Sequence, residues 1–218
     1  MSCGQICASV VLSGRREAPL RETAARIEAN AGTVVVKPGD LTDAGVASRV
    51  AAEIVSQFGR LDILVNNAVV RHFSPVHEFP VAAWDRSLAV NVSSAFHTIR
   101  LALPEMFARG WGRIINMSSI YGLIGAVNRV DYVTAKTALI GMTRAVALEN
   151  VTYGITCNVI CPGSSLTPAI DARIEALMSA AVLSREAAVE KYLADKQPSG
   201  RFIGTGSVAA LIAFLCGE

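Results

Sequence analysis

Short apolar runs alternate along this chain with longer segments in which apolar residues recur every three or four positions. The short runs are rich in β-branched residues and almost continuously apolar, as in strands that are buried on both faces of a sheet. They predict strands at residues 10–12, 33–36, 63–65, 113–117 and 155–160.

The longer segments have the period of an amphipathic helix. In residues 43–58, Val46, Val50 and Ile54 recur every four positions and form one apolar stripe. Helices are predicted at residues 19–30, 43–58, 81–109, 131–150, 167–196 and 207–215. Alternating strands and helices are typical of a parallel sheet whose right-handed crossovers place helices on both faces. We therefore predict one α/β domain over residues 1–218.

Composition narrows the class of protein. The hydrophobic content of 52% in 218 residues is enough for one substantial core. The longest apolar runs, such as residues 211–216, are far shorter than the roughly 20 residues that span a bilayer. The apolar start around Ile6 is a poor signal peptide, because its basic pair, Arg15 and Arg16, follows it. We expect a cytoplasmic protein without a membrane partner.

Charge and cysteine usage point to small-molecule partners. Twenty basic and eighteen acidic residues give a net charge of +2, with no long basic cluster, which does not favour nucleic acid as a partner. The five cysteines are odd in number and are expected to be reduced thiols. Cys157 and Cys161 lie in an apolar stretch and are predicted to be buried strand residues, so no metal site is expected.

The main candidate for chemistry is the segment that ends in Tyr132 and Lys136. These residues are four apart at the start of a predicted helix, so they project from one face, and Ser119 ends the preceding strand. A neighbouring ammonium lowers the pKa of a phenol, which would make Tyr132 an acid or base near neutral pH. The Ser119 hydroxyl could bind a substrate oxygen. By itself, a tyrosine four residues before a lysine is also typical of a surface pair.

Polar residues at other strand ends strengthen this interpretation. Residues 66–68 and Asp40 each follow an apolar strand, and Gly163 and Thr167 follow the last one. The carboxyl ends of parallel strands are where such folds bind ligands. Asn91 lies on an apolar helical stripe, so it either serves the site or is a core amide with satisfied hydrogen bonds.

The chain resembles the short-chain dehydrogenase/reductase family over nearly its whole length. The similarity lies in DLTD (40–43), LDILVNNA (61–68), LAVNVSSAF (88–96), GRIINMSS (112–119), YVTAK (132–136) and CPG (161–163). These motifs occur in order and at the family's spacing. The resemblance implies a Rossmann-like parallel sheet flanked by helices on both faces. It also implies an enzyme that transfers a hydride between a nicotinamide cofactor and a secondary alcohol or ketone.

The resemblance implies a role for each matching residue. Tyr132 would donate or accept the proton, and Lys136 would tune its pKa; both would contact the cofactor, Lys136 at the nicotinamide ribose. Ser119 would hold the substrate oxygen, and Asn91 would anchor a water that relays protons. Further cofactor contacts would come from Asp40 and Leu41 at the adenine, Asn67 and Ala68 at the adenosine half, and Gly163 and Thr167 beside the nicotinamide.

The two ends of the sequence depart from the family. Family members begin with a strand and a TGxxxGxG turn, whose amides cradle the cofactor's pyrophosphate at a helix N-terminus. Here the residues before Val10 contain one glycine, Gly4, and look like the tail of the first helix. The family's final strand after residues 207–215 is not found either. We expect a fragment, or less readily a crippled relative, that lacks the first βα unit and the last strand. Its sheet would be interrupted between residues 10–12 and 63–65.

The cofactor depends on the end of the strand at residues 10–12. An acidic residue there would bind the ribose hydroxyls of NAD, but Gly14 occupies the position and Arg15 and Arg16 follow. Arginine suits the 2′-phosphate of NADP, although the pair could also be a solvated entry to the next helix. We expect NAD, with Arg15 as a cofactor contact, and leave NADP open.

Within the family the sequence resembles the bacterial 3-hydroxybutyrate dehydrogenase branch, through residues 94–106, 109–116, 139–150 and 196–202. That branch binds the substrate carboxylate at positions occupied here by Arg71, Tyr121, Arg129 and Gln197. Two guanidinium groups suit a carboxylate, although surface arginines are the alternative. The resemblance implies a short 3-hydroxy acid as substrate and a homotetramer as the full-length form.

Two other functions remain open from the sequence. A reductase of 3-oxoacyl thioesters in the same family would prefer NADPH and substrates without a free carboxylate. A non-catalytic relative would keep the oligomer surface of helices 81–109 and 131–150 but bind no nucleotide.

Overall fold

The computed structural model describes residues 8–194 and 196–217. The strands are β1 (Ser9–Gly14), β2 (Thr33–Pro38), β3 (Ile63–Asn66), β4 (Gly112–Met117) and β5 (Ile155–Ile160). The α-helices are α1 (Glu17–Glu28), α2 (Ala44–Phe58), α3 (Val81–Leu88), α4 (Ser94–Arg109), α5 (Val130–Asn150), α6 (Pro168–Ala181), α7 (Arg185–Leu193) and α8 (Thr205–Leu215). All five predicted strands are present, each within three residues of its predicted ends.

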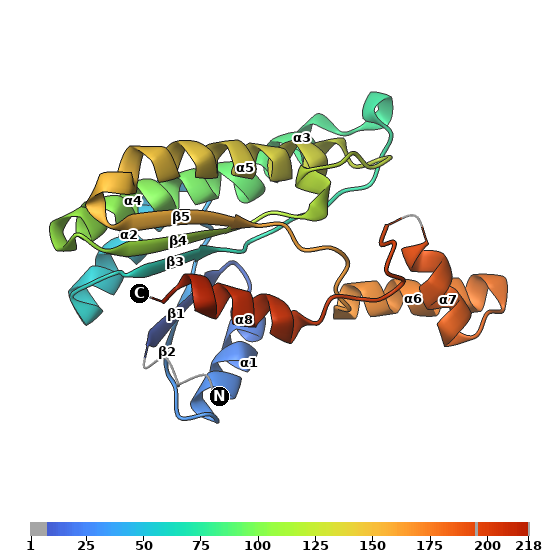
Figure 1. Cartoon of the computed structure of the whole chain (residues 1–218), viewed down its shortest axis with the longest axis horizontal. Helices are drawn as coiled ribbons and strands as arrows, with labels where there is room; N and C mark the ends of the chain where they lie inside the picture. Colours follow the sequence, from blue (N-terminus) through green and yellow to red (C-terminus); the bar gives the residue numbers. More distant parts are fainter. Residues whose placement is uncertain (1–7, 195, 218) are drawn as a thin grey trace.

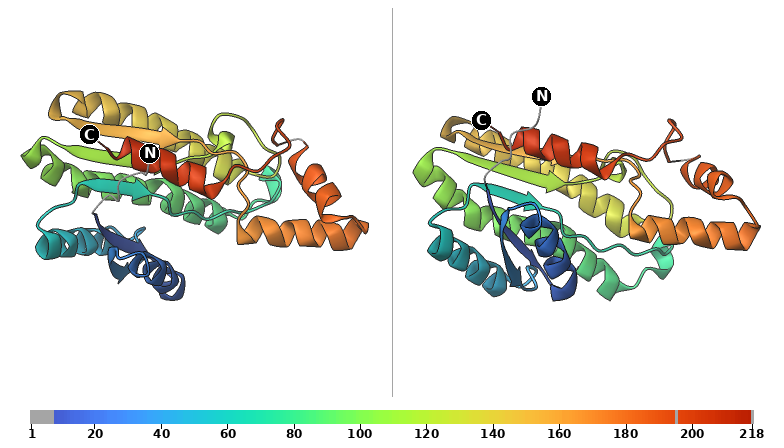
Figure 2. Two further views of the ribbon diagram at one scale, coloured as in Figure 1. Left: turned by 60° about the horizontal axis from the view of Figure 1, so that its bottom comes forward. Right: turned by 90° about the horizontal axis from the view of Figure 1, so that it is seen from below.

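The strands form two parallel sheets with helices on both sides. Strands β1 and β2 pair with each other, and β3, β4 and β5 form the second sheet in that order. Helices α2, α4 and α5 lie over one face of the three-stranded sheet, and α8 covers the other face (Figure 1). Helix α1 packs against β1 and β2, while α6 and α7 extend to one side (Figure 2). The predicted α/β Rossmann-like architecture is confirmed.

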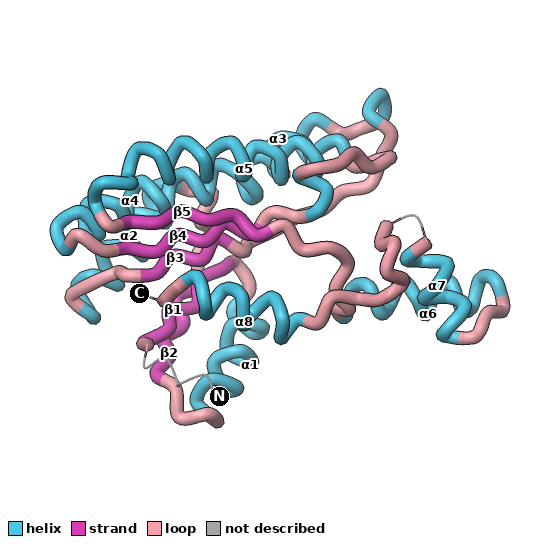
Figure 3. Tube along the Cα trace, viewed as in Figure 1, coloured by secondary structure: helices cyan, strands magenta, loops and turns pink. Residues whose placement is uncertain are grey.

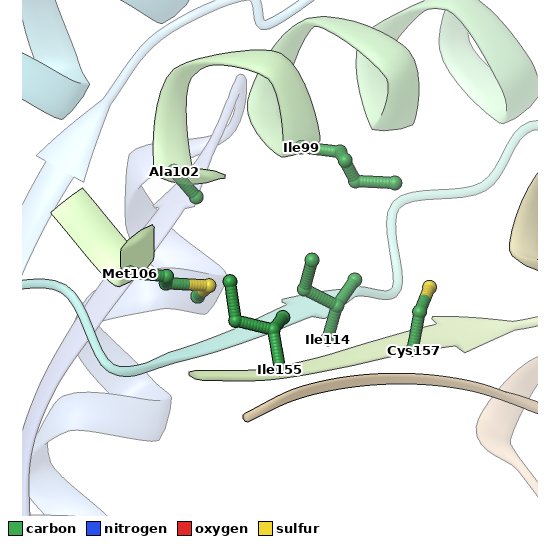
Figure 4. Close-up of a cluster of buried hydrophobic side chains, with 6 residues drawn as sticks. All are labelled: Ile99, Ala102, Met106, Ile114, Ile155 and Cys157. Carbon is green, nitrogen blue, oxygen red and sulfur yellow. The ribbon is translucent and has the colours of Figure 1, made fainter. Parts of the chain in front are cut away.

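Strand β4 is the centre of the larger sheet and is buried over its whole length. Successive side chains of a strand point to opposite faces, so Ile114 and Ile115 belong to different cores. The first core lies beneath α4 and contains Ile99, Ala102, Met106, Ile114, Ile155 and Cys157 (Figure 4). The second core places Ile115, Met117 and Ile160 against the apolar face of α8. Packing on both faces explains why the two successive residues Ile114 and Ile115 are both apolar.

The two sheets are separate at the position where the sequence predicts an interruption. No hydrogen bonds join β1 to β3, and no strand of the described part of the chain lies between them (Figure 3). The prediction that residues 1–9 include the tail of a helix concerns a segment of which residues 1–7 lie outside the described part.

Two predicted helices prove to be interrupted. Residues 81–109 form α3 and α4 separated by the π-helical turn η2 (Ala89–Ser93), where the chain widens around Asn91. Residues 167–196 form α6 and α7, because Val182 adopts a left-handed conformation with φ of 50° and ends α6. The side chain of Ser184 then caps α7 by accepting a hydrogen bond from the Ala187 amide.

Two smaller expectations can also be compared with the structure. Cys157 is a buried residue of β5, as predicted, but β5 ends at Ile160. Cys161 therefore lies in the following loop and is only partly buried, because the chain leaves the sheet there toward α6. None of the described helices is long and apolar enough to cross a membrane.

Candidate active site

The predicted site residues gather along one edge of the sheets, where the strands end. Arg15 follows β1, Asp40 and Leu41 follow β2, Asn67 and Ala68 follow β3, Ser119 follows β4, and Gly163 follows β5. Parallel strands with consecutive crossovers present their carboxyl ends at the same edge. Residues far apart in the sequence are therefore brought to one side of the molecule.

Tyr132 and Lys136 lie one turn apart near the start of α5, and both are more than nine-tenths buried. The Lys136 Nζ atom is 5.5 Å from the centroid of the Tyr132 ring. Tyr121 approaches the same ring edge-on, with 6.4 Å between centroids. The alternative of an exposed surface pair is therefore wrong, because α5 turns this face toward the sheet.

Lys136 joins α5 to the end of β4. Its ammonium donates a hydrogen bond of 2.6 Å to the backbone oxygen of Met117, and the Ser118 hydroxyl donates one of 2.8 Å to the backbone oxygen of Lys136. A Cβ atom at Gly122 would lie 2.8 Å from that same oxygen, so only glycine allows this close approach. Burial, reinforced by the charge of Arg71, lowers the pKa of Lys136 to about 8.

Ser119 lies directly beyond β4 and is nine-tenths buried. Its hydroxyl accepts a hydrogen bond of 3.3 Å from the backbone amide of Tyr121, which starts the short turn η3 (Ile120–Gly122). The amide of Ile120 donates to the backbone oxygen of Pro162 at 2.9 Å, which ties this turn to the loop after β5. Among the described residues no acceptor is found for the proton of the Ser119 hydroxyl.

Asn91 fastens the loop after β3 to the π-helical turn. Its amide nitrogen donates to the backbone oxygen of Val70 at 3.0 Å and to the Ser87 hydroxyl at 2.9 Å. Its side-chain oxygen accepts from the Val70 amide at 2.9 Å. Both side-chain N–H donors are thus engaged in the fold, as in a satisfied core amide. The relay role implied by the family resemblance stays a prediction.

A partly buried series of hydrogen-bonded polar side chains supports the site from inside. Of its members, the sequence analysis named only Asn66, for its position at a strand end. Asn66 donates to Asn116 at 2.9 Å and accepts from the Thr98 hydroxyl at 2.7 Å, and Asn116 donates to the Thr143 hydroxyl at 2.9 Å. This series links β3, β4, α4 and α5. The available signal was an asparagine inside an apolar strand, which requires partners when buried.

The predicted cofactor-binding residues differ in their exposure and in whether their side chains already have hydrogen-bond partners. Asn67 and Ala68 are exposed, and Asn67 has no hydrogen-bond partner within the described ranges. Asp40 is held by Arg86 at 2.9 Å and by Thr42, and Leu41 beside it is partly buried. The Thr167 side chain caps α6, and Arg15 is exposed after β1. Asn67, Ala68 and Arg15 are thus the accessible members of this set, whereas Asp40 and Thr167 are engaged within the fold.

Three of the four predicted substrate contacts surround Tyr132. The Arg129 and Arg71 guanidinium carbons lie 4.5 and 5.7 Å from the centroid of its ring, and Tyr121 completes the group. Gln197 instead fastens the loop after β5, accepting a hydrogen bond of 2.8 Å from the Ser164 amide and donating to the Arg201 backbone oxygen. Both ends of its amide are therefore occupied.

Sequence reasoning missed two neighbours of this group. Phe73 lies against Arg129, and Asp131 is fully buried beside Tyr132 with its carboxylate 3.1 Å from the Nδ1 atom of His72. These residues belong to no sequence motif with a distinctive spacing. Only their proximity in the structure identifies them.

Comparison with known proteins gives one consistent result. The family model of the short chain dehydrogenases matches residues 4–177. A D-beta-hydroxybutyrate dehydrogenase from Rhizobium meliloti is 41% identical over 189 residues, which cover 87% of this chain and 73% of that protein. An enzyme of the same name from Cupriavidus necator is 44% identical over 163 residues, covering 75% of this chain and 63% of that protein.

Solved structures agree with the sequence comparisons. A variant of actinorhodin polyketide ketoreductase with NADPH superimposes with a TM-score of 0.87 at 29% identity, covering 96% of this chain and 80% of the other. An NAD+-bound xylitol dehydrogenase superimposes with a TM-score of 0.86 at 26% identity, covering 96% of this chain and 83% of the other.

Proposed function

Because the chain belongs to the short-chain dehydrogenase family of oxidoreductases, we propose that it interconverts a short 3-hydroxy acid and its 3-keto acid with a nicotinamide cofactor. The observation that carries this proposal is the position of the Arg129 guanidinium, 4.5 Å from the ring centroid of Tyr132, which is itself buried one helical turn before Lys136. A proton-transfer group and a carboxylate-binding group thus share one site. The names of the two hydroxybutyrate dehydrogenases support the same substrate class.

Each side chain of this site has its own role in the proposed reaction. The Ser119 hydroxyl donates a hydrogen bond to the substrate oxygen, which orients the carbon that gains or loses a hydride. The Tyr132 phenol oxygen takes the hydroxyl proton in the oxidation and returns it in the reduction. Lys136 places its ammonium group 5.5 Å from the centroid of the Tyr132 ring. When bound, the nicotinamide supplies or accepts the hydride.

The substrate carboxylate binds to Arg129 and Arg71 in this proposal. A guanidinium offers parallel N–H donors to a carboxylate, and Arg129 has an Nε atom that is buried without a partner. Tyr121 contacts the Tyr132 ring edge-on and is the third member of this group. Gln197, engaged with Ser164 and Arg201, acts by shaping the loop and contacts the substrate only if that loop rearranges.

The described residues fit a nicotinamide dinucleotide at its two ends. Asn67 and Ala68 are exposed where the adenosine half would lie, and the loop of Gly163 and Thr167 borders the nicotinamide side. We propose NAD, as expected for the hydroxybutyrate dehydrogenase branch. The exposed Arg15 supports NADP as the alternative. In that case Arg15→Ala would weaken the binding of NADPH and leave the binding of NADH unchanged.

We also propose that the protein forms homotetramers in the cytoplasm. Large apolar side chains are exposed on α4 and α5, including Phe96, Phe107 and Leu148. Exposed apolar side chains of this size support association with a second copy of the chain. Light scattering of the purified protein tests this, and a monomer at micromolar concentration would contradict it.

The experiment that tests the proposed function compares an acid with its ester. In Arg129→Met, the KM for 3-hydroxybutyrate should rise by about tenfold or more, whereas the KM for its methyl ester should change little, because the ester has no charge to lose. Arg26→Met is the matched control, since Arg26 is exposed on α1, away from Tyr132.

The other outcomes distinguish the alternatives. Equal changes for acid and ester would remove Arg129 from carboxylate binding. A preference for the ester or for a 3-oxoacyl thioester would favour the thioester reductase; this chain is also similar to a polyketide ketoreductase. No turnover of any of these substrates would favour the non-catalytic relative.

A further inference from the structure

Three guanidinium groups from different parts of the chain gather beside the site. The Cζ atoms of Arg129 and Arg173 lie 4.0 and 4.2 Å from the ring centroid of Phe73, and Arg71 joins Arg129 at the ring of Tyr132. Arg71 follows β3, Arg129 precedes α5, and Arg173 belongs to α6. Arg129 is the centre of the group, because it contacts both rings.

No carboxylate of the described residues forms an ion pair with these groups, although the charge of the nearby Asp131 acts to raise the pKa of Arg129. Within residues 8–194 and 196–217, none of the three arginines forms an ion pair, and the acidic residues beside them are engaged elsewhere. Asp171 is bound to Arg185, and Asp131 faces His72. Arg129 is 8% exposed, and its Nε atom has no hydrogen-bond partner. A buried donor of this kind is costly unless a ligand satisfies it.

The spacing of the three guanidinium groups limits how many of them one carboxylate could bind. Since Arg129 and Arg173 share one ring, their Cζ atoms are at most about 8 Å apart, and like charges at such a distance repel each other. Burial, together with the charges of Arg71 and Arg173, lowers the pKa of Arg129 below its ordinary value. One carboxylate beside Tyr132 would compensate Arg129 and Arg71 but would leave Arg173 unpaired.

We propose that the substrate is a dicarboxylic 3-hydroxy or 3-keto acid, with Arg173 binding its second carboxylate on the side of Phe73. This inference rests on the proposed function, in which Arg129 and Arg71 bind the first carboxylate. Arg173 is thereby a specificity-determining residue: it distinguishes a diacid from a monoacid. Its contact with Phe73 holds the guanidinium plane in place before the substrate binds.

Calorimetric titration with three ligands tests the inference. The ligands are 3-hydroxyglutarate, its monomethyl ester and 3-hydroxybutyrate, each with and without NADH. We expect the diacid to bind at least about tenfold more tightly than the monomethyl ester, as one further charge-assisted hydrogen bond would provide. Arg173→Met should remove this advantage and leave the affinity for 3-hydroxybutyrate within about twofold of its original value.

Two further variants keep the result interpretable. Arg173→Lys keeps the charge but loses the planar pair of donors, so it should retain part of the preference for the diacid. Arg26→Met should leave all three affinities unchanged. Because Arg173 is exposed on α6, its substitutions are not expected to disturb folding, which circular dichroism checks.

The outcomes separate this inference from the proposed function. If diacid and monomethyl ester bind equally, or if Arg173→Met affects neither, the inference is overturned, while the proposed function stands as long as 3-hydroxybutyrate binding depends on Arg129. If Arg173→Met instead weakens the binding of NADH, Arg173 binds a phosphate of the cofactor and the inference is also overturned. If Arg129→Met leaves the binding of every acid unchanged, both proposals are overturned.

Discussion

The ammonium group of Lys136 donates a hydrogen bond of 2.6 Å to the backbone oxygen of Met117, the last residue of β4. A residue of α5 is thereby joined to the point where the central strand ends. Tyr132, one turn earlier on the same helix, takes its position from this contact. The cost is a buried cation, which gives the protein a measurable dependence on pH.

The first prediction concerns that dependence. The pKa of Lys136 in the folded chain is about 8, below its ordinary value of 10.5, so the unfolded state binds more protons between these two pH values. Stability should therefore rise with pH across this window, by roughly 3 kcal/mol in total, and the cost of the buried charge is fully present below pH 8. Urea denaturation at a series of pH values should show this rise in the parent and its absence in Lys136→Met. Parallel curves for the two proteins would contradict it.

The second prediction concerns proton transfer. Tyr132→Phe removes the transferable proton and leaves Lys136 in place, so turnover should fall by about 10²–10⁴-fold with little change in NADH affinity. Steady-state kinetics and fluorescence titration measure the two quantities. Tyr153→Phe, on the exposed turn after α5, serves as the control. Activity within tenfold of the parent would exclude Tyr132 from the mechanism.

The third prediction concerns the clamp at Asn91. Asn91→Ala leaves the amide and oxygen of Val70 without their partner, so the free energy of unfolding should fall by about 1–3 kcal/mol. The loop that carries Arg71 should also lose its position, which would raise KM for the acid. Ser48→Ala on the exposed face of α2 provides the comparison. An unchanged denaturation midpoint would show that the π-helical turn holds the loop without Asn91.

The sequence alone was sufficient for the order of strands and helices and for the central part of the site. The strands were recognisable by short runs of apolar, mostly β-branched residues, as Val34, Val35 and Val36 of β2 illustrate. Tyr132 and Lys136 were predictable as a pair, because a spacing of four places both on one face of any helix. The family motifs then located the remaining strand ends.

The tertiary structure decided which of these residues meet and where helices are interrupted. Residue spacing says nothing of Phe73 and Arg173, which are a hundred positions apart and meet only because α6 returns to the loop after β3. The π-helical turn depends on Asn91 reaching Val70, and the occupied amide of Gln197 depends on Ser164. Periodicity is a property of neighbouring residues, whereas these contacts depend on how the elements pack. The sequence therefore determined the fold class and the pairing of Tyr132 with Lys136, and packing determined the arginine cluster on which the proposed substrate rests.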